Sequence, residues 1–374
     1  MIPFNKPHLV GTENGYISEA LRTRKLSGDG AFTKRAQALI EAQLGSGKSL
    51  LTTSCTDALE AAALLCDLKP GDEVIVPSYT FVSTANAFAL RGATIRFADS
   101  GVENPNIDAA SVASLVNERT RVIVPVHYAG VACDMDALQT IADGVGATIV
   151  EDAAQAIAST YKGRPLGTFG TFSAFSFHET KNIVCGEGGA LHVNDQARAL
   201  DAEIVREKGT NRSAFFRGEV DKYNWVGLGS SYLPSELVAA FLTAQLEAID
   251  AIQARRIAVW DRYAERLAHL GQRDDCSLPV IPGYATNNAH MFYLVCGSLD
   301  IRTRLIDHLK ARGMMAVFHY QALHESPFFT TRNLTEPLPH AARYTDCLVR
   351  LPLYADMSME DADRVADAVW DFFG

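Results

Sequence analysis

The chain has 374 residues, 48% of them hydrophobic and 21% charged, and this balance is typical of an ordinary globular enzyme and excludes a largely disordered protein. Its formal net charge of −10 argues against nonspecific binding to nucleic acid or to an anionic membrane. Because its length exceeds what one hydrophobic core usually supports, we expect two lobes.

Between about residues 46 and 195, short apolar runs alternate with helical stretches, which indicates an α/β domain with a mainly parallel sheet covered on both faces. A helix is predicted to begin near Ser54 or Thr56, either of which is a suitable N-cap. The predicted strands, each bounded by Gly, Pro or Asp, are 73–76, 94–97, 122–126, 148–150, 171–177 and 189–193.

Residues 207–232 are polar, aromatic and weakly periodic, and they predict a long loop with a possible function. After Pro234 the apolar spacing becomes helical and predicts a long connecting helix through residues 246–267. The second lobe is predicted to hold strands around 290–295 and 316–320 and a final helix over 359–372. We therefore expect a large domain over 1–245 and a small domain over 246–374.

The seven cysteines form no C-x-x-C pair and their number is odd, so we expect reduced, mostly buried thiols. The first ten residues contain no long apolar stretch, and no apolar run reaches the roughly 18 residues of a membrane span. The sequence predicts a cytoplasmic protein that needs no membrane.

Lys181 and Asp152 are the most informative pair in the sequence. Lys181 follows an apolar strand and precedes the glycine-rich run 186–189, while Asp152 ends the apolar run 149–150 with a second acid. A solvated lysine and a helix-capping acid are the ordinary interpretations of such residues. Together they match pyridoxal phosphate, which needs a lysine for its aldehyde and an acid for its ring nitrogen.

Further residues suit the same cofactor. The hydroxyl-rich stretch 52–58, with Thr56 and Asp57, lies at a predicted helix start, where a phosphate binds readily. Gln155 can reach the cofactor's 3'-oxygen, and Phe81 can lie on its ring, although such an aromatic is more often part of a core. Ser176 lies on the strand before Lys181.

Two other ligands are disfavoured. Gly45 to Ser49 looks like a nucleotide P-loop, but the required first glycine is Ala42 and a helix precedes it instead of a strand. The histidines show no metal-ligand spacing such as H-E-x-x-H, so no metal is required.

Several segments resemble the DegT/StrS family of pyridoxal-phosphate sugar aminotransferases over nearly the whole chain. The similar segments are 2–5 (IPFN), 77–86 (PSYTFVSTAN), 124–132 (VPVHYAGVA), 151–155 (EDAAQ) and 175–182 (FSFHETKN). Segments 206–211 (REKGTN), 215–223 (FFRGEVDKY) and 229–233 (GSSYL) are similar to one branch, the dTDP-4-amino-4,6-dideoxygalactose transaminases.

The resemblance implies a fold-type I aminotransferase. Its large domain holds a seven-stranded, mostly parallel sheet, its smaller C-terminal domain is α+β, and a homodimer shares its active sites. It implies that Lys181 forms the Schiff base with pyridoxal 5'-phosphate, that Asp152 pairs with the ring nitrogen and that Gln155 meets the 3'-oxygen. Phe81 would stack on the ring, and the phosphate would be bound by Ser176, by the backbone of Thr56 and Asp57, and by Ser231 from the other subunit, where many relatives have asparagine.

The implied reaction is amination of the C4 ketone of dTDP-4-dehydro-6-deoxy-D-glucose by L-glutamate. Lys25, Arg212, Arg217 and Lys222 are candidates to contact the nucleotide diphosphate, although exposed basic residues are usually only solvated. Two alternatives stay open: amination of another nucleotide-linked keto sugar, at C3 or with glucose stereochemistry at C4, and a regulatory protein that binds the cofactor without turnover.

Overall fold

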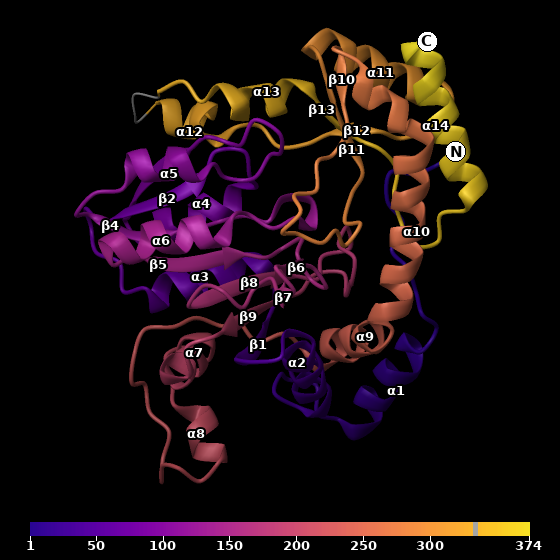
Figure 1. Ribbon diagram of the computed structural model, residues 1–374. Helices are drawn as coiled ribbons and strands as arrows, with labels where there is room; N and C mark the ends of the chain where they lie inside the picture. Colours follow the sequence, from indigo (N-terminus) through magenta and orange to yellow (C-terminus); the bar gives the residue numbers. More distant parts are fainter. Residues whose placement is uncertain (332–335) are drawn as a thin grey trace.

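The computed structural model describes residues 1–331 and 336–374 and has two lobes joined by a long helix (Figure 1). The larger lobe is built on a seven-stranded sheet in the order β1-β9-β8-β5-β4-β2-β3. Only β9 runs antiparallel to its neighbours, β1 and β8. The strands are β1 (Lys48–Thr52), β2 (Glu73–Pro77), β3 (Thr94–Ala98), β4 (Thr120–Ile123), β5 (Thr148–Asp152), β8 (Phe172–Ser176) and β9 (Gly189–Val193).

Both faces of this sheet are covered by helices because its strands are apolar on both sides. Consecutive residues of one strand enter different cores: Leu50 belongs to the cluster that contains residues of α3, α4 and α7, and Leu51 belongs to the cluster that contains residues of α2, α5, α6 and α9. These helices are α2 (Ala31–Leu44), α3 (Cys55–Leu65), α4 (Val82–Ala89), α5 (Ala109–Leu115), α6 (Met135–Val145), α7 (Ala199–Arg206) and α9 (Glu236–Glu247). The lobe also contains α1 (Glu13–Thr23), α8 (Arg212–Phe216) and the hairpin β6 (Thr160–Tyr161) and β7 (Arg164–Pro165).

The smaller lobe contains a four-stranded antiparallel sheet in the order β10-β11-β13-β12. A buried core lies between this sheet and the helices α10, α11 and α14, and Ile2 of the N-terminal arm belongs to it. The elements are β10 (Cys276–Ser277), β11 (Tyr293–Cys296), β12 (Val317–Phe318), β13 (Leu348–Arg350), α10 (Ile249–Leu267), α11 (Leu299–Ala311), α12 (Pro327–Thr330), α13 (Pro339–Cys347) and α14 (Met359–Phe373). Short 3-10 turns occupy Tyr128–Gly130, Gln196–Arg198, Ala268–Gln272 and Leu323–Glu325.

The expected α/β fold with a seven-stranded, mostly parallel sheet is confirmed. Two details differ from prediction. The helix expected through residues 246–267 is divided at Ala248 into α9 and α10, which are bent by 64°. The loop expected over 207–232 contains α8. The domain boundary predicted after residue 245 falls near the end of α9, and this division stays a prediction.

In the described part of the chain, no single helix is both long and apolar enough to cross a bilayer. The bent pair α9 and α10 reaches such a length only when the two helices are taken together.

Candidate functional site

A cavity of about 650 Å³ lies where the carboxyl ends of β2, β5 and β8 meet the small lobe. Asp152 and Ser176 are the last residues of β5 and β8, and Phe81 precedes the first residue of α4, so the topology brings these side chains to one edge of the sheet. The cavity is lined by the predicted residues Thr56, Phe81, Asp152, Gln155, Ser176 and Lys181. Its volume falls in the range of ligand pockets, about 300–1,000 Å³.

The Asp152 carboxylate is buried without a cationic partner. Its Oδ2 accepts a hydrogen bond from Thr84 Oγ1 at 2.7 Å, and its Oδ1 accepts one from the backbone N–H of Ala154 at 3.1 Å. Burial raises the pKa of Asp152, while these hydrogen bonds and the charge of Lys181 oppose that rise. Among the described residues, no lysine, arginine or histidine nitrogen lies within 4.0 Å of the Asp152 carboxylate. A cationic group of a ligand can therefore be its partner.

Lys181 lies in the turn after β8, where its backbone N–H donates to His178 O at 2.9 Å. Its Nζ has no hydrogen bond or ion pair with the described residues. Burial lowers the pKa of Lys181, and the charge of Arg350 lowers it further, whereas Cys55 and Asp152 act in the opposite direction. A lysine amine with a lowered pKa is more readily neutral and hence nucleophilic.

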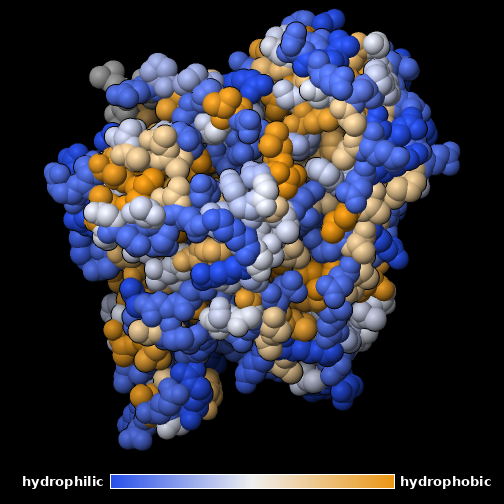
Figure 2. Space-filling view, viewed as in Figure 1, coloured by the Kyte–Doolittle hydropathy of each residue, from blue (hydrophilic) through white to orange (hydrophobic). Residues whose placement is uncertain are grey.

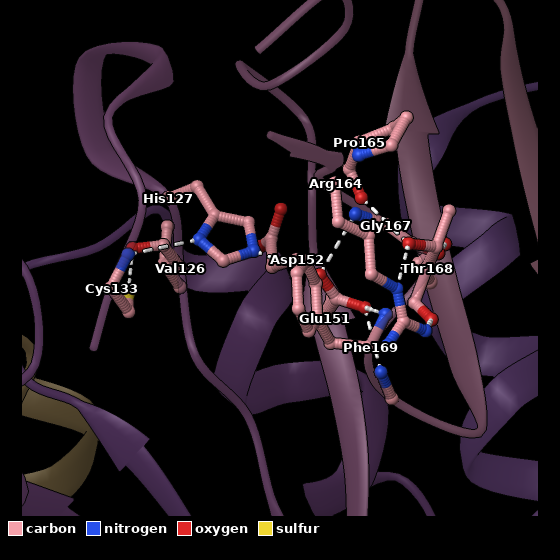
Figure 3. A network of polar contacts seen from close by, with 12 residues as sticks. Val126, His127, Cys133, Glu151, Asp152, Arg164, Pro165, Gly167, Thr168 and Phe169 are labelled. Carbon is pink, nitrogen blue, oxygen red and sulfur yellow. Dashed lines mark hydrogen bonds and ion pairs between the residues drawn. The ribbon is translucent and has the colours of Figure 1, made fainter. Parts of the chain in front are cut away.

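A buried polar network holds the strand that carries Asp152 (Figure 3). The carboxylate of Glu151 accepts hydrogen bonds from His127 Nε2 at 3.0 Å and from the backbone N–H groups of Gly167, Phe169 and Gly170 at 2.7–2.8 Å. The backbone N–H of Cys133 donates to His127 Nδ1, so Nε2 carries the proton given to Glu151. The network joins three segments behind the cavity.

One end of the cavity is built to receive an anion. The helix α3 begins at Cys55, and its N-terminal N–H groups attract negative charge. The hydroxyls of Thr56 and Ser176 line this end. A Cβ on Gly189 would lie 2.4 Å from the Ser54 carbonyl carbon, so only glycine lets β9 pass this close to the helix start. Asp57 does not line the cavity, and its N–H donates instead to the N-cap Ser54 Oγ.

The opposite end is closed by polar and aromatic side chains of both lobes. Gln155 Oε1 accepts from Ala129 N at 2.6 Å and its Nε2 donates to Tyr320 Oη at 3.0 Å. His319 stacks on Tyr320 with ring centroids 3.6 Å apart. Phe81 is 55% exposed, which leaves its face available to a ring. Sequence reasoning missed the small-lobe residues here, His290, His319, Tyr320 and Arg350.

The predicted nucleotide contacts lie elsewhere. Lys25, Arg212 and Arg217 line a second cavity of about 500 Å³ formed by α2, α7 and α8. Arg212 pairs with Glu207 at 2.8 Å, and Arg217 pairs with Glu203 at 2.9 Å. Lys222 and Ser231 are exposed and line neither cavity. Their predicted roles therefore stay predictions.

The residues around Lys181 fit pyridoxal phosphate. An anion cradle lies at the start of α3, an unpaired carboxylate can face a cationic ring nitrogen, and a half-buried amine can bind an aldehyde. The hydroxyls, carboxylate and amine belong to one cavity.

Comparison with known proteins gives two findings. A model of the DegT/DnrJ/EryC1/StrS aminotransferase family matches residues 7–370. Similar solved structures include S. venezuelae DesV in complex with a ketimine intermediate, which has 31% identity, a TM-score of 0.90 and coverage of 99% of this chain and 98% of that chain. The aminotransferase TlmJ from Streptoalloteichus hindustanus has 28% identity and a TM-score of 0.91, with coverage of 100% and 99%.

Spr1654 from Streptococcus pneumoniae, in its PMP form, has 24% identity, a TM-score of 0.92 and coverage of 100% and 99%. The comparisons confirm the expected aminotransferase fold and enzyme class, and pyridoxal phosphate is the cofactor.

Proposed function

Because the chain belongs to the DegT/DnrJ/EryC1/StrS aminotransferase family, we propose that it transfers the amino group of L-glutamate to the C4 ketone of dTDP-4-dehydro-6-deoxy-D-glucose in the cytoplasm. The products are dTDP-4-amino-4,6-dideoxy-D-galactose and 2-oxoglutarate. The observation that carries the proposal is the cavity in which the unpaired Lys181 amine and the unpaired Asp152 carboxylate lie together. The choice of sugar is supported by the resemblance of segments 206–211, 215–223 and 229–233 to one branch of the family.

Bound pyridoxal phosphate supplies an electron-withdrawing ring that stabilises negative charge on the carbon from which a proton is removed. Lys181 would hold the cofactor covalently through Nζ. The same Lys181 amine would be the base that takes a proton from the donor's α-carbon and the acid that returns one to the product. Its lowered pKa suits this work, because a neutral amine is needed as nucleophile and base.

Asp152 keeps the ring nitrogen protonated, since a buried carboxylate strongly favours a cation beside it. Thr84 fixes its orientation through the 2.7 Å hydrogen bond. Gln155, fixed by Ala129 and Tyr320, has a second Nε2 proton for the cofactor's 3'-oxygen. Phe81 covers the ring.

The phosphate is held by Thr56, by Ser176 and by the N-terminal backbone of α3. Asp57 lies in the first turn of this helix. These groups supply hydroxyl donors and the positive end of the helix dipole. Ser231 contributes from the second subunit.

We also propose a homodimer in which the second cavity of one protomer faces the active site of its partner. Support comes from large apolar side chains that α8 and its following loop leave in solvent: Phe216, Trp225 and Leu228 are 68%, 78% and 64% exposed. Figure 2 shows apolar atoms at the end of the molecule where α7 and α8 lie in Figure 1. In this arrangement Lys25, Arg212, Arg217 and Lys222 approach the nucleotide diphosphate of the partner's substrate.

The test is product analysis. Purified protein is incubated with pyridoxal phosphate, L-glutamate and dTDP-4-dehydro-6-deoxy-D-glucose, and the product is identified by mass and NMR, with Lys181→Ala as the control. We expect a Lys181-dependent 4-amino-4,6-dideoxygalactose nucleotide. Glutamate conversion without this product overturns the substrate, and a protein that binds the cofactor but never converts glutamate overturns the transaminase.

A further inference from the structure

The N-terminal arm, residues 2–10, precedes the first helix and begins inside the small lobe. Ile2 is 2% exposed in the small-lobe core and forms an isolated bridge with Met314. Its backbone N–H donates to Gly313 O at 2.8 Å, and its carbonyl accepts from Met315 N at 3.0 Å. The helix that follows the arm, α1, packs on α9 of the large lobe. The arm therefore runs from one lobe to the other, and Figure 1 shows its indigo trace passing from the N label beside α14 to α1.

A second attachment of the arm also involves both lobes. His8 Nδ1 lies 2.7 Å from Oδ1 of Asp356, in the small-lobe segment after β13. The carbonyl of His8 accepts from Gln245 Nε2 of α9 at 2.8 Å. The arm is thus attached at Ile2 and at His8, so a movement of the small lobe displaces the residues between these two points.

The middle of the arm lies at the active-site cavity, where Phe4 and Asn5 are lining residues together with Lys181. On the small-lobe side, the Phe4 ring lies 4.6 Å from Cζ of Arg350. On the large-lobe side, Asn5 Nδ2 donates to Glu179 O at 3.0 Å. Because a backbone carbonyl can only accept, the nitrogen of the Asn5 amide must face it. Neighbouring side chains of the arm therefore contact the two walls of one cavity.

The carbonyl that Asn5 contacts belongs to the turn that carries the amine. In this turn, residues 178–181, the backbone N–H of Lys181 donates to His178 O at 2.9 Å, and the central residues Glu179 and Thr180 are exposed. Among the described side chains, Asn5 alone donates to a carbonyl of the turn. A lysine amine ends a flexible four-carbon stem, so its reactive position depends on how firmly the backbone beneath it is held.

We infer that Asn5 is a positioning residue for Lys181, and that the N-terminal arm couples the position of the small lobe to the turn that carries this lysine. The inference rests on the role of Lys181 proposed above. The hydrogen bond from Asn5 holds the turn, and the attachments at Ile2 and His8 hold Asn5. A displaced small lobe withdraws Asn5 and loosens the turn, whereas a packed small lobe keeps the amine in place.

Hydrogen exchange in the cofactor-free protein tests whether Asn5 holds the turn. Asn5→Leu keeps the approximate size of the side chain but removes the donor, and Asn5→His restores a donor through a ring N–H. Asn14→Leu, at an exposed position of α1, is the matched control. Loss of one hydrogen bond should raise amide exchange in residues 178–182 about 3- to 10-fold in Asn5→Leu, while the other two variants match wild type. Unchanged exchange in Asn5→Leu overturns the inference.

A double-mutant cycle tests the coupling between the small lobe and the turn. Ile2→Ala loosens the first attachment of the arm and should raise exchange both in the small lobe and in residues 178–182. In the Asn5→Leu background, Ile2→Ala should raise exchange in the small lobe only, because the connection to the turn is already broken. If Ile2→Ala leaves residues 178–182 unchanged, or adds its full effect there to that of Asn5→Leu, the arm does not act through Asn5 and the inference is overturned.

Uptake of pyridoxal phosphate by the cofactor-free protein, followed by absorbance, tests the consequence for Lys181. Asn5→Leu should slow uptake about 3- to 10-fold, because a displaced amine meets the aldehyde less often in a reactive geometry, and Asn5→His should match wild type. A turn that loosens without slower uptake overturns the inference. If Lys181→Ala gives the same absorbance change as wild type, the proposed role of Lys181 fails instead, and hydrogen exchange still decides whether Asn5 holds the turn.

Discussion

Replacing Glu151 with glutamine should destabilise the large lobe strongly, although the two side chains have the same shape. Each oxygen of Glu151 accepts two hydrogen bonds: Oε1 from Phe169 and Gly170, and Oε2 from His127 and Gly167. Whichever oxygen becomes NH₂, two buried donors then face another donor. At about 1–3 kcal/mol for each orphaned group, the free energy of unfolding should fall by about 2–6 kcal/mol.

The effect should depend on pH in a defined direction. Burial favours protonation of Glu151, but the hydrogen bonds from His127 and from the backbone N–H groups of Gly170 and Gly167 outweigh it, so its pKa is lowered. A carboxylate with a lowered native pKa stabilises the fold above its unfolded pKa, about 4.3, and this contribution is lost as the pH falls through the native value. The gap between wild type and Glu151→Gln should therefore be constant from about pH 5 to 8 and shrink below about pH 4.

Urea unfolding of the cofactor-free proteins, followed by far-ultraviolet circular dichroism, measures this gap. Glu265→Gln is the matched control, because Glu265 is exposed and pairs only with Arg262 on the same helix, so a change under about 0.5 kcal/mol is expected. If Glu151→Gln were as stable as that control at pH 7, the reasoning about two orphaned donors would be refuted.

Three further changes concern activity. Lys181→Ala should abolish turnover and shift the absorbance of bound cofactor, while the cofactor-free protein keeps its unfolding midpoint, because the Lys181 ammonium has no partner to lose. Asp152→Asn should lower turnover about 10²- to 10³-fold and weaken cofactor binding, as measured by steady-state kinetics and cofactor titration, because it removes one partner of a buried ion pair. Alanine at the four predicted nucleotide contacts should raise KM for the sugar nucleotide, measured at saturating L-glutamate, and an unchanged KM would remove them from the substrate site. The four are Lys25, Arg212, Arg217 and Lys222.

Much of the large lobe could be predicted from its sequence because its strands are continuous apolar runs between turn residues. Strand β9 matches its predicted range, and β2, β3 and β5 differ from theirs by one or two residues. The strand β1 was missed, since Lys48–Thr52 has only two apolar residues and follows glycines. The division at Ala248 was missed because no Gly or Pro marks it, and tertiary packing decides such breaks.

The candidate site could be predicted only on the large-lobe side. Lys181, Asp152 and Ser176 follow from the rule that ligands lie at the carboxyl ends of parallel strands. Tyr320 and Arg350 depend on how the small lobe packs over that edge, which no local pattern specifies. One signal for Arg350 does exist in the sequence: it is the only charged residue in the apolar run 348–353.

Glu151 and Asp152 are adjacent on β5, and their side chains lie on opposite faces of the sheet. Because side chains alternate along a strand, Glu151 points into the network of Figure 3 and Asp152 points into the cavity. Glu151 meets four donors and is satisfied by the protein, whereas Asp152 meets two and has no cation. Glu151→Gln should therefore lower the stability of cofactor-free and cofactor-loaded protein by similar amounts. Asp152→Asn should lower mainly the extra stability that the cofactor provides, since that carboxylate gains its partner only on binding.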